Sequence, residues 1–331
     1  MRNFPKRKLK CDSNIYFLDY EPKTSDFHKE ALEGLENPPK KLSPKFFYDE
    51  KGSDLFEQIC HLEEYYITRT ELGILNENSK DISKTIGPKC CLIEFGSGNN
   101  RKVKILLDHL ENPMTYMPID ISKEHLLRSA EEVAQEYPNL DVLAVCADYT
   151  QMIRLPEWIE AQNKVAFFPG STIGNLGPNE AMQFLENTHH LLNDGEGLLI
   201  GVDLKKDPKV LNAAYNDAKG ITSDFNKNVL RRMNAELGTQ FDLNSFKHKA
   251  HYVPDKGRVE MHLVSQKDQT VCLGDSPIRF AKGESIHTEN SYKYSLDEFK
   301  RMANKAGFES KKVWMDSEEY FSVHYLEVAP Q

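Results

Sequence analysis

Glycine, acidic and aromatic residues at three places along the chain could bind a nucleoside-containing cofactor. Gly96 and Gly98 follow an apolar run, and only residues without a Cβ let the backbone approach a ligand closely. Asp120 ends a second run, where a carboxylate can accept hydrogen bonds from both ribose hydroxyls. Asp148 and Tyr149 end a third run, where an acid and a ring can hold an adenine. Each residue alone is also a common turn former or helix cap. Together, at successive strand ends, they favour S-adenosylmethionine.

The glycine pair departs from the dinucleotide-binding fingerprint. Arg101 stands where that fingerprint has its third glycine, which disfavours a pyrophosphate cradle and counts against a dehydrogenase. Lys102, at the start of the following helix, could meet the carboxylate of the cofactor's methionyl group. A solvated surface lysine is an equally good interpretation of that residue.

The elements that would position these residues alternate between short apolar runs and helical stretches. This alternation predicts a parallel sheet with right-handed crossovers. The predicted strands are 91–95, 116–119, 142–145, 165–168 and 198–202, and helices are expected at 103–110 and 123–136.

The alternation stops for about ninety residues after the fifth strand and then resumes. Within this block we expect a helical piece at 210–237. A strand pair follows it, in which Met261 lies on the same face as Val259 and Leu263. Ser295 and Glu298 then form a capping box that opens a helix ending at Gly307. Strands at 311–315 and 320–328 close the chain. A parallel sheet followed by one helix and an antiparallel pair resembles the Rossmann-like layout of class I methyltransferases.

We therefore predict an α/β fold with three parts. Residues 1–40, which are polar and interrupted by proline, are expected to form an N-terminal arm. Residues 41–205 and 295–331 form the methyltransferase domain. Residues 206–294 form a smaller inserted α+β domain that binds the substrate.

Composition excludes several classes of protein. The 331 residues carry 42 Lys plus Arg and 51 Asp plus Glu, a net charge of −9 that argues against a nucleic-acid partner. The sequence contains no apolar run of the ~18 residues that a membrane span needs. The basic start has no apolar segment behind it, so we expect a cytoplasmic protein without a signal peptide. The six cysteines form no Cys-x-x-Cys pair and the eleven histidines show no ligand spacing, so we expect no metal site.

Several longer motifs closely resemble the histidine N-alpha-methyltransferases of ergothioneine biosynthesis, from about Pro39 to the C-terminus. These motifs are Phe-Pro-Gly-Ser-Thr-Ile-Gly-Asn-Leu at 168–176, Phe-Tyr-Asp at 47–49, Glu-Tyr-Tyr-Ile-Thr-Arg-Thr-Glu at 64–71, Asp-Leu-Lys-Lys-Asp-Pro at 203–208, Ala-Tyr at 214–215 and Phe-Asn-Lys-Asn at 225–228. The resemblance implies transfer of three methyl groups from S-adenosylmethionine to the α-amine of L-histidine. The products are hercynine and S-adenosylhomocysteine. We expect a monomer whose partner is this small amino acid.

The resemblance also implies roles for individual residues. Asn175 and Tyr215 would hold the α-amino and α-carboxylate end of the substrate. Tyr48 would lie nearby, as a catalytic residue together with Asn175 and as a cofactor contact. The imidazole would be held by Tyr66, Glu289 and Ser291. Met261 would favour histidine over substrates with larger rings.

Glu289 and Ser291 are two apart, so in an extended strand both side chains point the same way. A carboxylate that accepts from one ring nitrogen and a hydroxyl that serves the other would suit an imidazole. The chain differs from the family pattern after the glycine turn, at 99–101, and at Asn290. We expect Glu289 and Asn175 to share one cavity.

Two other functions remain open on the sequence. A related enzyme could methylate tryptophan or another indole, which would suit a larger site without an imidazole-reading acid. A binding protein could hold S-adenosylmethionine without turnover. No His/Asp pair stands out as a base, so we expect the amine proton to pass to solvent, through a water or a tyrosine hydroxyl.

Overall fold

The computed structural model describes residues 14–22, 26–160 and 162–329. The basic start of the chain lies outside the described residues. Contacts divide the chain into two compact units, which are described separately below. Among the described residues, the first unit contains 14–22, 70–160, 162–204 and 294–329, and the second contains 26–69 and 205–293.

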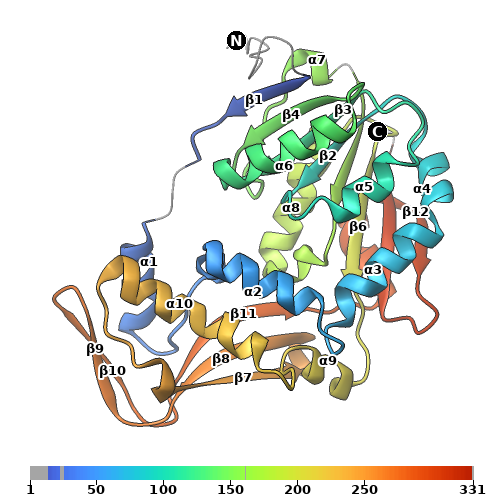
Figure 1. Ribbon diagram of the computed structural model, residues 1–331. Helices are drawn as coiled ribbons and strands as arrows, with labels where there is room; N and C mark the ends of the chain where they lie inside the picture. Colours follow the sequence, from blue (N-terminus) through green and yellow to red (C-terminus); the bar gives the residue numbers. More distant parts are fainter. Residues whose placement is uncertain (1–13, 23–25, 161, 330–331) are drawn as a thin grey trace. The chain divides into compact units, whose positions relative to one another are not determined.

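The first unit is built on an eight-stranded sheet of order β1-β4-β3-β2-β5-β6-β13-β12 (Figure 1). The pairs among β1 to β6 are all parallel, whereas β13 runs antiparallel to both β6 and β12. This is the predicted class I methyltransferase sheet, and all five expected parallel strands are present. Their bounds are β1 Ile15–Asp19, β2 Cys90–Phe95, β3 Thr115–Asp120, β4 Asp141–Cys146, β5 Asn163–Phe168, β6 Gly197–Asp203, β12 Phe308–Met315 and β13 Phe321–Val328.

Helices cover this sheet, and the central strands are therefore buried along their whole length. Every residue of β2 and of β6 is buried, as expected for parallel strands between two helical layers. The capping box at Ser295 is present, because its hydroxyl accepts from Glu298 N at 3.2 Å and Glu298 Oε2 accepts from Ser295 N at 2.7 Å. The helices of the unit are α4 Ser79–Ile86, α5 Arg101–Leu107, α6 Lys123–Glu136, α7 Glu157–Glu160, η2 Thr172–Asn175, α8 Pro178–Leu191 and α11 Leu296–Lys305. Helix α3, Tyr66–Glu77, begins in the second unit and ends in the first.

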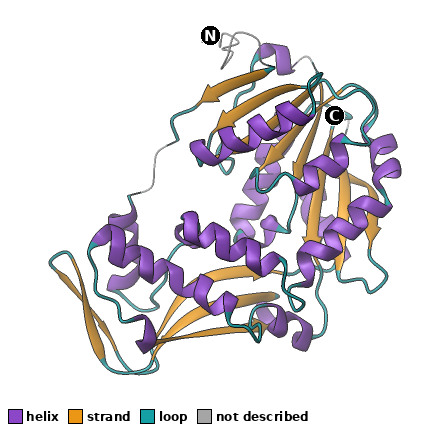
Figure 2. Ribbon diagram, in the orientation of Figure 1, coloured by secondary structure: helices purple, strands orange, loops and turns teal. Residues whose placement is uncertain are grey.

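The second unit combines helices with a three-stranded antiparallel sheet of order β11-β8-β7 and a separate hairpin, β9-β10 (Figure 2). The three residues expected on one face of β8 are buried, namely Val259, Met261 and Leu263, and Glu260 of the other face is buried as well. The helices are α1 Phe27–Glu36, η1 Pro44–Phe47, α2 Glu50–Cys60, α9 Pro208–Ala214, α10 Ile221–Leu237, η3 Leu243–Ser245 and η4 Pro254–Lys256. The strands are β7 Phe246–Val253, β8 Arg258–Ser265, β9 Gln269–Leu273, β10 Ser276–Phe280 and β11 Ser285–Tyr292.

The N-terminal region differs from the prediction. Residues 15–19, expected in an arm, form an edge strand that pairs with β4. Residues 24–69, divided in the prediction between the arm and the methyltransferase domain, belong to the second unit. The physical reason is burial of apolar side chains within that unit. Phe27 stacks on Phe46 with ring centroids 4.1 Å apart, and Phe47 packs against Phe225 of α10 at 4.7 Å.

The helical piece expected at 210–237 is two helices rather than one. Helix α9 ends before Tyr215, and α10 begins after Gly220, whose φ of +76° is incompatible with a continuous helix. The break places Tyr215 at the C-terminal end of α9. Within the described residues, we find no helix of the length and apolarity that crossing a bilayer requires.

Candidate active site

The glycine turn after β2 has space beside it and an unpaired polar atom in it. Gly96 has a φ of +76°, and a Cβ added at Gly98 would meet no atom of the described residues within 4 Å. Ser97 is fully buried, yet its hydroxyl oxygen has no hydrogen-bond partner in the described part of the chain. Buried polar groups are normally hydrogen-bonded, so this hydroxyl fits a site where a ligand supplies the partner.

The ends of β2, β3 and β4 lie side by side, as the sequence predicted. Gly96 N donates to Ile119 O at 2.9 Å, and Ala147 N donates to Asp120 O at 3.1 Å. Burial raises the pKa of Asp120, whose carboxylate accepts from Ser122 N at 2.8 Å. The predicted acids therefore meet at one edge of the sheet.

Asp148 and Tyr149 follow β4 in a tight turn. The Asp148 carboxylate accepts from the backbone N and the hydroxyl of Thr150, at 2.9 and 2.6 Å. The Tyr149 ring lies 5.7 Å from that of Phe168 and 6.1 Å from that of Phe95. The turn thus fixes the acid and the ring together.

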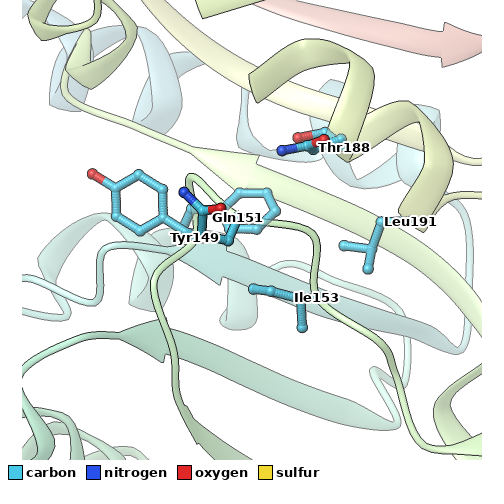
Figure 3. Close-up of a pocket in the computed structure, with 7 residues that line it drawn as sticks. Tyr149, Gln151, Ile153, Thr188 and Leu191 are labelled. Carbon is cyan, nitrogen blue, oxygen red and sulfur yellow. The ribbon is translucent and has the colours of Figure 1, made fainter. Parts of the chain in front are cut away.

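A small pocket lies beside Tyr149 (Figure 3). Its cavity volume is about 10 Å³, close to the space that one water needs, so it does not hold an adenine by itself. Figure 3 shows Gln151 next to the Tyr149 ring, with Thr188 and Leu191 of α8 further along the pocket. The remaining lining residues are Phe95, Ile153 and Asn187.

Lys102 is not a solvated surface lysine. Its Nζ lies 2.6 Å from Oε2 of Glu71, a carboxylate that is only 1% exposed. The same carboxylate accepts from Gly170 N at 2.8 and 2.9 Å. A Cβ at Gly201 would lie 2.1 Å from Glu71 Oε1, so the carboxylate fills the space over that glycine. Sequence reasoning quoted Glu71 only as part of a motif and missed this role.

Sequence reasoning also missed Glu94, a buried acid near the end of β2. Burial raises the pKa of Glu94 to about 7, while its hydrogen bond from Tyr116 and the charge of Lys102 lower it. The available signal was one acidic residue inside an otherwise apolar strand. Glu71, Glu94 and Asp120 together outnumber the single Lys102, so this edge of the sheet favours a cationic ligand.

The loop after β5 carries Asn175 at the end of η2. Gly170 has a φ of +80°, and Ser171 has a φ of +54°. The Ser171 hydroxyl accepts from Asp203 N at 2.9 Å, which fixes the loop to the end of β6. Asn175 is half-buried.

In the second unit, β11 brings several predicted substrate residues together. Glu289 pairs with Met261, and Ser291 pairs with Val259, so these side chains share one face of the sheet. Tyr215 donates from its hydroxyl to Ser291 Oγ at 2.8 Å, and Lys293 Nζ donates to both hydroxyl oxygens. We call this group the β11 cluster, and its members are Tyr215, Met261, Glu289, Ser291 and Lys293.

Burial raises the pKa of Glu289 to about 7, against an opposing effect of Lys293. The ring of Tyr65 lies edge-on to that of Tyr215, with centroids 6.1 Å apart. Burial raises the Tyr65 pKa well above its usual value, and the Glu289 charge contributes. Lys293 and Tyr65 were not among the predicted site residues.

Two further predicted residues, Tyr48 and Tyr66, also belong to the second unit. Tyr66 is buried at the start of α3, where its hydroxyl accepts from Lys206 Nζ at 2.6 Å. Tyr48 is 42% exposed, and its ring lies edge-on to those of Phe56 and Phe225. The roles of both tyrosines stay predictions.

The Phe-Asn-Lys-Asn motif of α10 acts as a scaffold. Asn228 is fully buried and donates to Phe47 O at 3.1 Å and to Asp49 Oδ1 at 2.7 Å. Asp49 also caps α2 by accepting from Gly52 N at 2.7 Å. Asn228 therefore holds the loop that carries Tyr48.

The structure groups histidines that the sequence did not. Possible ligand atoms of His251, Glu260 and His262 lie within 4.8 Å of one another. However, Glu260 Oε1 already accepts from Lys256 at 3.0 Å and from Arg258 at 2.5 Å, which opposes a further cation. The expectation that the chain has no metal site stays a prediction.

Comparison with known proteins identifies the family. The sequence pattern of a family described as "Histidine-specific methyltransferase, SAM-dependent" matches residues 27–328. The histidine N-alpha-methyltransferase of Mycolicibacterium smegmatis is 37% identical over 306 residues, covering 91% of this chain and 94% of that protein. The enzyme of the same name from Mycobacterium tuberculosis is 36% identical over 293 residues, covering 87% and 90%. Ergothioneine biosynthesis protein 1 of Neurospora crassa is 34% identical over 297 residues, covering 87% of this chain and 33% of that protein. With the class I sheet, the open glycine turn and a family match over nearly its whole length, the chain belongs to the S-adenosylmethionine-dependent, histidine-specific methyltransferases.

Proposed function

We propose that the chain methylates the α-amine of L-histidine three times, giving hercynine in ergothioneine biosynthesis. The observation that carries this proposal is the β11 cluster. It offers a carboxylate acceptor and an ordered pair of hydroxyls on one face of a sheet. An imidazole has two ring nitrogens that such a pair of groups can serve. The names of the relatives from M. smegmatis, M. tuberculosis and N. crassa support the same reaction and pathway.

The residues at the sheet edge fit the methyl donor. We propose that Gly96 and Gly98 admit its methionyl part and that Lys102 meets the methionyl carboxylate, while Asn175 holds the α-amino and α-carboxylate end of the substrate. Asp120 would accept hydrogen bonds from the ribose hydroxyls. Asp148 and Tyr149 would hold the adenine. When bound, S-adenosylmethionine supplies a methyl group already activated by its sulfonium. The unpaired Ser97 hydroxyl and the excess of carboxylates support a cationic ligand at this edge.

Position is then the main requirement of the chemistry. The amine nitrogen forms the new bond to carbon as the carbon–sulfur bond breaks, and the amine proton leaves to water before each attack. Aligned reactants gain ~7–11 kcal/mol from positioning alone. We propose that Tyr215 holds the amino-acid end and that Tyr48 adds cation–π attraction of about 0.5–2 kcal/mol as the amine becomes a quaternary ammonium. Tyr66 and Met261 would complete the surroundings of the imidazole.

The partner is a small amino acid. We propose that the protein works as a cytoplasmic monomer that binds neither nucleic acid nor membranes, and the net charge of −9 supports the first exclusion. That one histidine molecule meets both Asn175 of the first unit and Glu289 of the second stays a prediction. A crystal structure with histidine and S-adenosylhomocysteine tests it directly.

The function itself is tested by mass spectrometry after incubation with S-adenosylmethionine and a panel of free amino acids. We expect stepwise gain of three methyl groups on histidine alone. Methylation of tryptophan in place of histidine would support the indole alternative. Cofactor binding without S-adenosylhomocysteine formation on any amino acid would support a binding protein.

A further inference from the structure

A buried lysine joins the two hydroxyls of the β11 cluster. Lys293 is 2% exposed, and its Nζ donates to Ser291 Oγ at 2.8 Å and to Tyr215 Oη at 3.0 Å. An ammonium group can only donate hydrogen bonds. Both hydroxyl oxygens are therefore acceptors toward Lys293.

These contacts fix where the hydroxyl hydrogens point. Tyr215 gives its hydrogen to Ser291 Oγ at 2.8 Å. The serine oxygen then accepts from both Tyr215 and Lys293, which uses both of its lone pairs. With Tyr215 as the donor to Ser291, the Ser291 hydrogen points away from the triangle of three groups. Ser291 is therefore a donor toward any ligand that it meets.

Glu289 supplies the complementary group. It lies two residues before Ser291 on β11, a separation of about 6.7 Å along an extended strand. That distance suits a five-membered ring with one hydrogen bond on each side. The charges of Glu289 and Lys293 offset each other, and Lys293 favours the ionised form of this carboxylate by lowering its pKa.

We propose that Lys293 is a positioning residue that makes Ser291 a hydrogen-bond donor and so selects the neutral imidazole ring of the substrate. The inference rests on the proposed function and extends it to the ring's protonation state. A neutral imidazole has one N–H for Glu289 and one lone pair for Ser291.

Two other rings fit this arrangement less well. An imidazolium presents two N–H groups, so one would face the Ser291 hydrogen, and its charge would lie near Lys293. An indole has one N–H and no ring lone pair, which leaves the Ser291 hydrogen unpaired. Another titratable group beside the cluster is the phenol of Tyr65, which interacts electrostatically with Glu289 and Tyr215 and also with Tyr48 and the Cys60 thiol. The arrangement thus discriminates by hydrogen-bond polarity as well as by size.

The test replaces the lysine and observes the bound ring. The full-length protein is saturated with S-adenosylhomocysteine and with histidine labelled with ¹⁵N in its imidazole, so no turnover occurs. ¹⁵N NMR then reports the protonation of each ring nitrogen during a pH titration. Lys293→Met is compared with the natural chain and with Lys247→Met, which removes an exposed lysine from β7.

In the natural chain and in Lys247→Met we expect one protonated and one unprotonated nitrogen at pH 7. In Lys293→Met the pKa of the bound ring should rise by about one unit or more, because Glu289 then acts on it alone. Calorimetry should show roughly ten- to a hundredfold weaker histidine binding. Lys293→Arg, which keeps the charge, should restore the neutral ring.

Contrary outcomes are distinct. Two protonated nitrogens in the natural chain at pH 7 would overturn the inference without any variant, even if Lys293→Met failed to fold. Identical ring titrations in Lys293→Met and the natural chain would overturn it while leaving histidine methylation intact. Failure of the natural chain to bind histidine at all would remove the proposed function, and the inference with it.

Discussion

Replacing Glu94 by Gln should change how the stability of the first unit depends on pH. Glu94 is 4% exposed, and burial raises its pKa from 4.5 to about 7. The folded state therefore binds a proton more tightly than the unfolded state does. Stability is fully present below about pH 4.5 and is lost as the pH rises through about 7.

The size of this loss follows from the two pKa values. Their difference, 7 − 4.5, is about 2.5 pH units, and each unit corresponds to 1.36 kcal/mol, so the loss is about 3 kcal/mol. Glutamine carries no charge at any pH, and its carbonyl oxygen can still accept from Tyr116. The free energy of unfolding of Glu94→Gln, relative to the natural chain, should thus rise by about 3 kcal/mol between pH 4.5 and pH 8.

Urea unfolding followed by circular dichroism at several pH values measures this difference. Glu77→Gln, which alters an exposed glutamate at the end of α3, is the matched control and should give a curve parallel to that of the natural chain. If Glu94→Gln also ran parallel to the natural chain over this range, the reasoning from burial would be refuted.

Three further substitutions test other contacts. Gly201→Ala should destabilise the fold by about 3–5 kcal/mol in urea titrations, because its Cβ would displace the buried Glu71 carboxylate. The control is Gly73→Ala in α3, whose Cβ would meet no described atom outside its own helix within 4 Å and which should stabilise the fold by about 0.5–1 kcal/mol. Equal shifts in the two variants would contradict this. Glu289→Ala, which removes the acceptor, should lower kcat/KM for histidine by roughly a hundredfold or more while the Kd for S-adenosylmethionine, measured by calorimetry, stays unchanged; undiminished histidine use would show that the imidazole is held elsewhere. Asn228→Ala should cost about 1–3 kcal/mol in thermal or urea unfolding, since it removes two hydrogen bonds that a buried amide donates to the loop before α2; an unchanged midpoint would exclude the scaffold role.

The sheet domain was predictable because its signals are local. The run 198–202 is apolar throughout and the run 92–95 is apolar except for Glu94, as expected for strands buried on both faces. The start of the helix after Ser295 was predictable from its capping box. The βα rhythm breaks near 204–205 and 293–294, where the chain passes from one compact unit to the other.

The remaining parts depend on contacts distant in sequence. Strand β1 is a short apolar run of β-forming residues, but it pairs with β4 more than a hundred residues later, so its place in the sheet depends on a contact distant in sequence. From the sequence alone, the charged residues Glu71 and Lys293 look like surface residues. In the folded structure both are buried. Glu94 was accessible from sequence as a single acid in an apolar strand. The assignments of Tyr48, Tyr66 and Asn175 came from family resemblance and not from periodicity or spacing.

The divided origin of the second unit bears on how the protein is made. Its first piece, 24–69, leaves the ribosome before the 135 residues at 70–204 that separate it from its second piece. At 5–20 residues per second, synthesis of that stretch takes roughly 7 to 27 s. During this interval Phe46 and Phe47 lack the α10 surface that covers them in the native state. The nascent chain therefore exposes apolar aromatic surface for many seconds. Chaperones bind unfolded chains that expose surface of this kind. A circular permutant that began at residue 70, with the natural ends joined, would leave only 294–331 and 1–23 between the two pieces and would shorten that exposure.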